Sequence, residues 1–464
     1  MRWLLCLSII CVSAFASEDV IISSNYNNAA SVFSLRADDY RSYTTAAFSF
    51  VADWCWSNDF PISFATETRT QNAASWETLE SLMQNRGVSP IDHSWNGYIG
   101  IPSPEEGTNR YTTAQVSDLP QIALDFNSSS NAWQTSLTFP ERNRYNGHNY
   151  IHNFVTPSQY PTNMAVLPTF LDIIATNNFM AIAHTGQDNA LATPYWTNDY
   201  GNAGLFVYDS AGSYTKEMMD GFNNDLEMDD PKNSGPPSNL YYYTTNYYAE
   251  SRAAGTFCGV AFHPYYNWVS IGRTGVEEDM AIGNFLRWVN SLDYKDEWRC
   301  GIGDWLQYMY FRNNAGLSIQ CAEGDSSATI AVSCPEYQRS RWGGSYPLTY
   351  VYTNDTAMAS SNLNVYYKGQ NDSLYRQLEE YTSAERITGI EAVRKEGDIF
   401  YISAALPQTG TNFVLVVAQQ NPVRANLNGK VLLLMIVPPV PYYALYDSDG
   451  KRCVDSDGKF IYVP

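Results

Sequence analysis

The residues best suited to hydrolytic chemistry in this chain are a few histidines and the carboxylates near them. His93 and His263 stand at the start of a loop or directly after an apolar run, and Asp53 ends the apolar run of residues 48–52. An imidazole can bind a metal ion or move a proton near neutral pH, and a carboxylate can act as a base. Asp53, His93 and His263 are therefore the candidate site. The chain has only five histidines, which are His93, His148, His152, His184 and His263.

The other histidines offer weaker alternatives. His148 and His152 have the spacing that places two rings on one face of a helix, but Tyr145-Asn146-Gly147 before them is typical of a turn. His184 follows a predicted strand at 179–183, where it lines a cleft or merely ends the strand. A metal role for His148 and His152 stays open.

The elements that must position the candidate residues alternate in type from about residue 25 to 315. Alternating strands and helices predict a parallel sheet or a (β/α) barrel, in which groups at the C-terminal ends of the strands meet at one mouth. Asp53 is expected there with His93 and His263. The expected strands include 46–52, 179–183 and 258–262, and the expected helices are 75–83, 167–176, 282–292 and 302–311.

The pattern changes after about residue 316, where short strand-like segments are separated by turn-rich spacers. This pattern predicts an all-β sandwich over residues 316–440. Two Asp-Gly turns near the end predict a terminal β-hairpin over residues 441–464. The expected sandwich strands are 317–320, 328–333, 348–353, 363–367, 399–404 and 413–417.

Several segments, in order, resemble the polysaccharide deacetylase superfamily, of the NodB-homology or carbohydrate esterase family 4 type. The run that ends in Asp53 resembles the first motif of that family, an apolar strand ending in an Asp pair. Residues 61–66 resemble its second strand, and residues 76–96 resemble its helix, glycine and His-Ser motif with His93. Residues 259–264 resemble the late strand whose histidine lies beside the scissile group, and residues 298–312 resemble the closing helix.

The resemblance covers residues 46–314 and implies metal-assisted removal of N- or O-acetyl groups from a polysaccharide. A divalent metal such as zinc polarises the carbonyl and acidifies a water in such chemistry. Asp53 is then the base or a metal ligand, His93 a metal ligand and His263 the acid. The family binds metal through a further histidine four residues after the first, where this chain has Gly97. The third metal ligand is therefore not identified.

This sequence begins with the features of an exported protein. Arg2, an apolar run and the small residues Ala14 and Ala16 give the order of a secretory signal peptide over residues 1–16. Six cysteines follow it, which allows up to three disulfides in an extracytoplasmic protein, and Cys321 and Cys334 could close one hairpin.

Composition adds a charge and an aromatic signal. The formal net charge of −20 argues against nucleic acid and anionic membranes as partners. The 35 tyrosines and 12 tryptophans suit amphipathic sugar rings, although all-β proteins also use tyrosine in packing. Trp54, Trp95 and Tyr265 lie next to the candidate residues and are the predicted substrate-binding aromatics.

The sequence thus predicts a secreted deacetylase-like hydrolase that acts on an extracellular polysaccharide and uses a divalent metal. One alternative is a non-catalytic carbohydrate-binding or surface protein with the same fold. Another is a glycoside hydrolase with paired carboxylates, for which Glu67, Asp188 and Asp304 are available.

Overall fold

The computed structural model describes most of the chain from residue 20 onward. The described residues are 20–95, 114–140, short segments between 144 and 209, 239–255, 257–262, 264, 281–314, 316–334, 346–381, 389, 391–407, 412–419 and four later strands. The predicted signal peptide lies outside them. Among the described residues, no helix combines the length and the hydropathy needed to cross a bilayer.

The first part of the chain is a mixed α/β region built on a nine-stranded sheet in the order β11-β2-β3-β4-β7-β8-β10-β9, with β12 beside β2. All pairings are parallel except that of β9 with β10. The order runs from β11 to β9, and its closure into a barrel stays a prediction. The strands are β2 (Ser31–Tyr40), β3 (Ile62–Thr66), β4 (Ser89–Asp92), β7 (Asn153–Val155), β8 (Ala181–His184), β9 (Tyr195–Thr197), β10 (Leu205–Asp209), β11 (Phe257–Phe262) and β12 (Glu297–Arg299).

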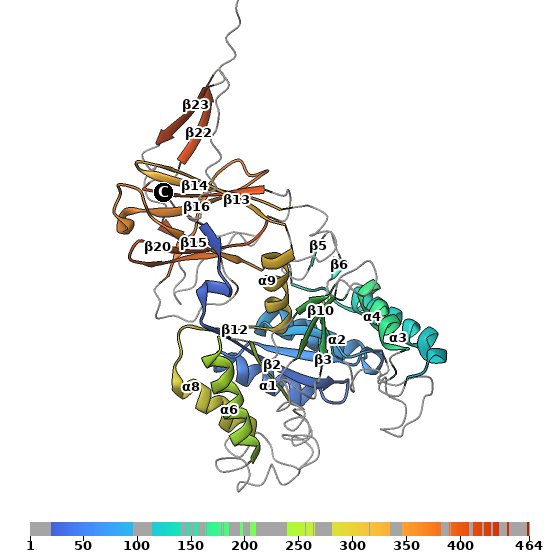
Figure 1. Ribbon diagram of the computed structural model, residues 1–464. Helices are drawn as coiled ribbons and strands as arrows, with labels where there is room; N and C mark the ends of the chain where they lie inside the picture. Colours follow the sequence, from blue (N-terminus) through green and yellow to red (C-terminus); the bar gives the residue numbers. More distant parts are fainter. Residues whose placement is uncertain are drawn as a thin grey trace, which may run out of the picture.

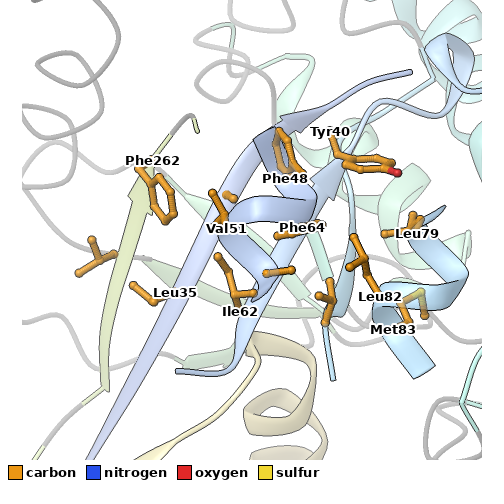
Figure 2. Packing of buried hydrophobic residues seen from close by; sticks show 14 of the residues in the cluster. Leu35, Tyr40, Phe48, Val51, Ile62, Phe64, Leu79, Leu82, Met83 and Phe262 are labelled. Carbon is orange, nitrogen blue, oxygen red and sulfur yellow. The ribbon is translucent and has the colours of Figure 1, made fainter. Parts of the chain in front are cut away.

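Residues 46–52, expected as a strand, are part of the helix α1 (Thr45–Ser57), so that expectation was wrong. Ala47, Phe48, Val51, Ala52 and Cys55 are the buried positions, and this spacing follows the helical period rather than the alternation of a strand. A short apolar run does not distinguish the two structures until the buried side is known. Figure 2 shows Phe48 and Val51 packed against Ile62 and Phe64 of β3 and against Leu35 of β2.

The helix α2 (Ala73–Arg86) confirms the prediction for residues 75–83. It begins two residues earlier because Asn72 and Ser75 form a reciprocal capping box, and it ends where Gly87 takes a left-handed conformation. Leu79, Leu82 and Met83 pack toward the same core (Figure 2). The other helices of this region are α3 (Leu119–Ser136), α4 (Leu167–Thr176), α6 (Asn239–Ala253), α8 (Ala281–Leu292) and α9 (Ile302–Asn314).

The second part of the chain contains two five-stranded sheets, in the orders β1-β15-β20-β19-β18 and β13-β14-β21-β16-β17. Their inner faces share one core, and the rings of Tyr350 and Phe413 from opposite sheets lie 5.9 Å apart. All six expected strands are present. The strands are β1 (Val20–Ile22), β13 (Ser318–Gly324), β14 (Ser327–Ser333), β15 (Leu348–Thr353), β16 (Asn364–Gly369), β17 (Arg376–Gln377), β18 (Glu379–Glu380), β19 (Ala392–Glu396), β20 (Ile399–Ala404) and β21 (Asn412–Ala418).

Three further strand pairs lie outside these sheets. β5 (Arg144–Tyr145) pairs with β6 (His148–Asn149), so His148 is in a short strand and not on a helix shared with His152. β22 (Pro422–Leu427) pairs with β23 (Lys430–Met435). β24 (Tyr443–Ala444) pairs with β25 (Tyr462–Val463), while the Asp-Gly turns between them are outside the described residues.

The strand register argues against a bond between Cys321 and Cys334 across the β13–β14 hairpin. Ile330 lies opposite Cys321, and Cys334 is four residues further along the chain. At about 3.3 Å per residue this is about 13 Å, beyond the reach of a disulfide.

The two parts of the chain meet through β1 and α9. β1 pairs with β15 of the second part although it precedes the α/β region in the sequence. α9 contacts β2, β3 and β4 on one side and β15 on the other, and Figure 1 shows it between the two sets of strands. Its first backbone N–H, that of Ile302, donates a hydrogen bond to Ser63 near the start of β3. α9 therefore covers the edge of the sheet where the strands begin.

We expect Gly301→Ala to destabilise the protein, because a Cβ at this position would lie 2.6 Å from the Cβ of Ser89 at the start of β4. A forced contact of this kind costs about 1–3 kcal/mol. Ser89→Gly should recover much of this loss in the double variant, measured by urea unfolding of all four proteins. Equal losses with and without Ser89→Gly would contradict the proposed contact.

Candidate active site

A β-bulge places two consecutive carboxylates at the C-terminal end of β2. Ala37 pairs with Phe64 and Tyr40 with Thr66, so β2 has one more residue than β3 between these pairs. Asp39 has a φ of 69°, which is uncommon for a residue other than glycine. Neighbouring side chains in a regular strand point to opposite faces, whereas a bulge changes this alternation. The bulge thus brings Asp38 and Asp39 to the same mouth of the sheet.

Four charged or ionisable side chains meet beside this bulge. His93 follows β4, and its Nε2 lies 3.3 Å from Oδ1 of Asp39. Glu67 follows β3, and its Oε1 lies 2.6 Å from a terminal nitrogen of Arg41. The same nitrogen is 3.4 Å from Oδ2 of Asp39. The ends of three adjacent parallel strands therefore supply one cluster, Asp39, Arg41, Glu67 and His93, here called the mouth cluster.

Backbone hydrogen bonds fix the loops that carry the mouth cluster. The N–H of Glu67 donates to the carbonyl of Tyr40, and the N–H of His93 donates to the carbonyl of Thr66. Oγ1 of Thr44 accepts from the N–H of Arg41 at 2.8 Å and lies within hydrogen-bond distance of the carbonyl of Asp39. Three loops are thereby held to one another, which limits the freedom of the side chains they carry.

The mouth cluster changes the proton affinities of its members. Burial lowers the pKa of His93, but its hydrogen bond to Asp39 and the charges of Asp38, Asp39 and Glu67 outweigh that effect and leave the pKa above its usual value. Burial, followed by the charge of Asp39, raises the pKa of Glu67, and Arg41 opposes this shift. The imidazole is therefore favoured in its charged form, in which it can donate a proton.

Asp38 forms a buried ion pair with Arg36, which lies two residues earlier on the same face of β2. Nε and one terminal nitrogen of Arg36 lie 2.7 and 2.9 Å from the two carboxylate oxygens of Asp38. Both side chains are almost completely buried. This two-point contact fixes the carboxylate of Asp38 behind the mouth cluster, where its charge acts on His93.

Asp92, the last residue of β4, anchors the loop that carries His93. Its carboxylate accepts hydrogen bonds from the N–H of Ser94 and, on α3, from Oγ of Ser129 and Nε1 of Trp133. Ser94 has a φ of 74°. Burial raises the pKa of Asp92 to about 7, despite these hydrogen bonds. Asp92 therefore stabilises an unusual backbone conformation directly after His93.

The described side chains do not fit a metal ion. Among the described residues, no group of three or more His, Cys, Asp and Glu comes together in a way that could hold a metal. Asp39, Glu67 and His93 are near one another, but the guanidinium of Arg41 already contacts both carboxylates. Gly97, at the position where the resemblance implies a further ligand, lies outside the described residues.

Asp53 does not lie with His93, because the residue is in α1 and not at a strand end. It is eight residues after the start of α1, which is about 12 Å along the helix from the β2 mouth. Its side chain is 58 % exposed and forms an ion pair with Arg86 at the end of α2. Both helices run back toward the start of the next strand, so this pair lies at the edge opposite the mouth cluster.

The other predicted residues are distributed differently. Trp95 follows the His93 loop, and its backbone N–H donates to Oδ2 of Asp125 in α3. Trp54 is in α1, where its ring stacks near Phe60. His263, Tyr265 and Asp188 lie outside the described residues, so their predicted roles stay predictions. Asp304 is buried in α9 at the opposite edge, apart from Glu67.

Sequence reasoning missed Asp38, Asp39 and Arg41. The signal was the Asp38-Asp39 pair at the end of a segment with alternating apolar residues, Val32 to Ala37. That segment is the strand preceding α1, and it fits an apolar strand ending in an Asp pair better than the run before Asp53 does. Arg41 carried no comparable signal, because its contact with Glu67 depends on how two loops meet.

The chain is similar in structure to several proteins from bacteria. A protein from Mycobacterium smegmatis named as a polysaccharide deacetylase is 13 % identical, with a TM-score of 0.42 over 62 % of this chain and 92 % of that one. A family 4 acetyl xylan esterase from Clostridium thermocellum, in complex with a cobalt ion, is 13 % identical, with a TM-score of 0.27 over 56 % and 84 %. A family 4 carbohydrate esterase from Streptomyces lividans, in complex with acetate, is 13 % identical, with a TM-score of 0.31 over 58 % and 91 %.

No protein-family model and no curated protein sequence matches the chain.

We expect Asp92→Asn to cost most stability at low pH. A raised pKa means that the folded protein keeps the proton of Asp92 where the unfolded chain has lost it, so this group's contribution to stability falls between about pH 4 and 7, by on the order of 1 kcal/mol per pH unit. Asparagine does not titrate. The loss caused by Asp92→Asn in urea unfolding should therefore shrink as the pH rises. A loss that grows with pH would contradict the raised pKa.

Proposed function

We propose that this protein is a hydrolase that removes acetyl groups from an extracellular polysaccharide. The observation that carries the proposal is the contact of 3.3 Å between Nε2 of His93 and Oδ1 of Asp39 at the mouth of the parallel sheet. A carboxylate and an imidazole at this distance can share the proton transfers of acyl hydrolysis. The extracellular location rests on the signal-peptide pattern in residues 1–16.

In this proposal, Asp39 accepts a proton from the water that attacks the acetyl carbonyl carbon. His93, charged because of the carboxylates around it, then donates a proton to the departing nitrogen or oxygen of the sugar. Asp38 keeps a negative charge behind His93 and is itself fixed by Arg36. The bond between the carbonyl carbon and the sugar heteroatom breaks, and acetate and the deacetylated sugar leave.

The charge of the protein and the surface near the mouth agree with a neutral carbohydrate. Tyr43 lies two residues from Arg41, is 71 % exposed and can present its ring to a sugar face. Trp95 is partly exposed directly after the His93 loop. We propose that these two aromatic residues contact the polysaccharide. Metal dependence, which the sequence resemblance implies, is not part of this proposal, and chelation tests it.

Two substitutions test the assigned roles. Asp39→Asn and His93→Ala should each lower acetate release from acetylated glycans by about 100-fold or more, because each removes a proton-transfer group. Acetate is measured after the same incubation with each folded variant. Asp53→Asn is the matched control, since it alters an exposed carboxylate at the other edge of the sheet, and we expect no loss.

The same experiment separates the proposal from its rivals. Acetate release that survives in both Asp39→Asn and His93→Ala, or falls equally in Asp53→Asn, contradicts the assigned site. Glycan binding without acetate release indicates a carbohydrate-binding protein. New reducing ends indicate a glycoside hydrolase, for which Glu67 and Asp39 have carboxylates no more than 6.0 Å apart because both contact one nitrogen of Arg41.

A further inference from the structure

The guanidinium of Arg41 lies between two carboxylates of the mouth cluster. One terminal nitrogen contacts the carboxylates of Glu67 and Asp39, at 2.6 and 3.4 Å. Asp39 in turn contacts His93. The side chain of Arg41 is only 12 % exposed, so water screens these contacts less than it does on an open surface. The guanidinium therefore balances the negative charge of two buried carboxylates.

A metal ion at the mouth would compete with this guanidinium for the carboxylate oxygens of Asp39 and Glu67. A protein zinc site normally uses three side-chain ligands, and the candidates at the mouth are Asp39, Glu67 and His93. Two of these three contact Arg41, whose charge is permanent at any physiological pH. A divalent ion bound there would lie close to a fixed positive charge and would have to displace it.

The second terminal nitrogen of Arg41 faces the solvent side of the cluster. It donates a hydrogen bond of 2.8 Å to the hydroxyl of Tyr43. Tyr43 is 71 % exposed, so its hydroxyl can be exchanged for another acceptor at small cost. A carbonyl oxygen of a bound substrate is such an acceptor, and a cationic donor stabilises the negative charge that develops on it.

We propose that Arg41 is the resident cation of this site, in the place where a divalent metal would bind Asp39, Glu67 and His93, and that its outer nitrogen binds the acyl oxygen of the substrate. The second half rests on the proposed hydrolase function, whereas the first half does not. During attack on the carbonyl carbon, the oxygen gains the electron pair of the C=O bond while Arg41 keeps its proton. When acetate forms, that electron pair returns.

The first half is tested with zinc alone. In the arrangement described, Asp39, Glu67 and His93 do not come together as a metal site. Arg41→Gln removes both the charge and the contacts that hold the two carboxylates. The three side chains can then converge, so this variant should bind one zinc ion per chain, and the added change His93→Ala should abolish that binding. The wild type and Arg41→Lys, which keeps a cation, should show no zinc binding that depends on His93. Arg86→Gln, which removes an exposed arginine from another ion pair, is the matched control and should behave as wild type.

Zinc binding is measured by equilibrium dialysis of the purified full chain, and thermal unfolding checks that each variant is folded. Equal His93-dependent zinc binding by wild type and Arg41→Gln overturns the proposal, and so does its absence from folded Arg41→Gln. If Arg41→Gln does not fold, the wild type compared with His93→Ala decides: His93-dependent zinc in the wild type overturns the proposal, and none supports it.

The second half is tested by kinetics on an acetylated glycan. We expect Arg41→Gln to lower kcat by about 100-fold, with a smaller loss in Arg41→Lys, and we expect chelation to leave wild-type activity unchanged. An unchanged kcat in Arg41→Gln, or loss of wild-type activity on chelation, overturns this half. If the wild type releases no acetate but gives the expected zinc result, the proposed function is wrong and the assignment of Arg41 as the resident cation is still supported.

Discussion

The extra residue at the end of β2 is the constraint on which the mouth of this protein depends. Because β2 has one more residue than β3 before the strands separate, Asp38 and Asp39 both lie at the same mouth of the sheet. Asp39 adopts a positive φ, and in the turn that follows the hydroxyl of Thr44 accepts a hydrogen bond from the backbone N–H of Arg41. Backbone strain of this kind persists where the surrounding structure fixes it, and it is concentrated at functional sites.

Ion pairs and hydrogen bonds satisfy the buried carboxylates at the mouth, one within a single strand and others between elements. Arg36 fixes Asp38 within β2, while Arg41 joins the ends of β2 and β3 through Glu67. Asp92 ties the end of β4 to α3. A buried pair is costly to break, because the remaining charge has no partner and little water. The network therefore holds three strand ends in one arrangement.

The N-terminal ends of the strands, at the edge opposite the mouth, connect the α/β region to the rest of the fold. α9 covers the strand starts at Ser63 and Ser89 and lies against β15, so it joins the α/β region to the two antiparallel sheets. β1 strengthens this junction, because the first described strand of the chain belongs to the second part of the fold. Asp53, Arg86 and Asp304 lie toward this edge. The C-terminal ends of these strands therefore carry the mouth cluster, and their N-terminal ends join the two parts of the chain.

The sequence by itself determined the α/β pattern, the all-β second part and His93 at the end of a strand, because local periodicity and turn chemistry specify individual elements. It also contained the Asp38-Asp39 pair. Only the tertiary structure decided that residues 46–52 are helical, since an apolar run has a defined side only when its neighbours are known. The structure likewise placed Arg41 beside Glu67, 26 residues away in the sequence. That contact depends on strand order and loop packing, which no local pattern specifies.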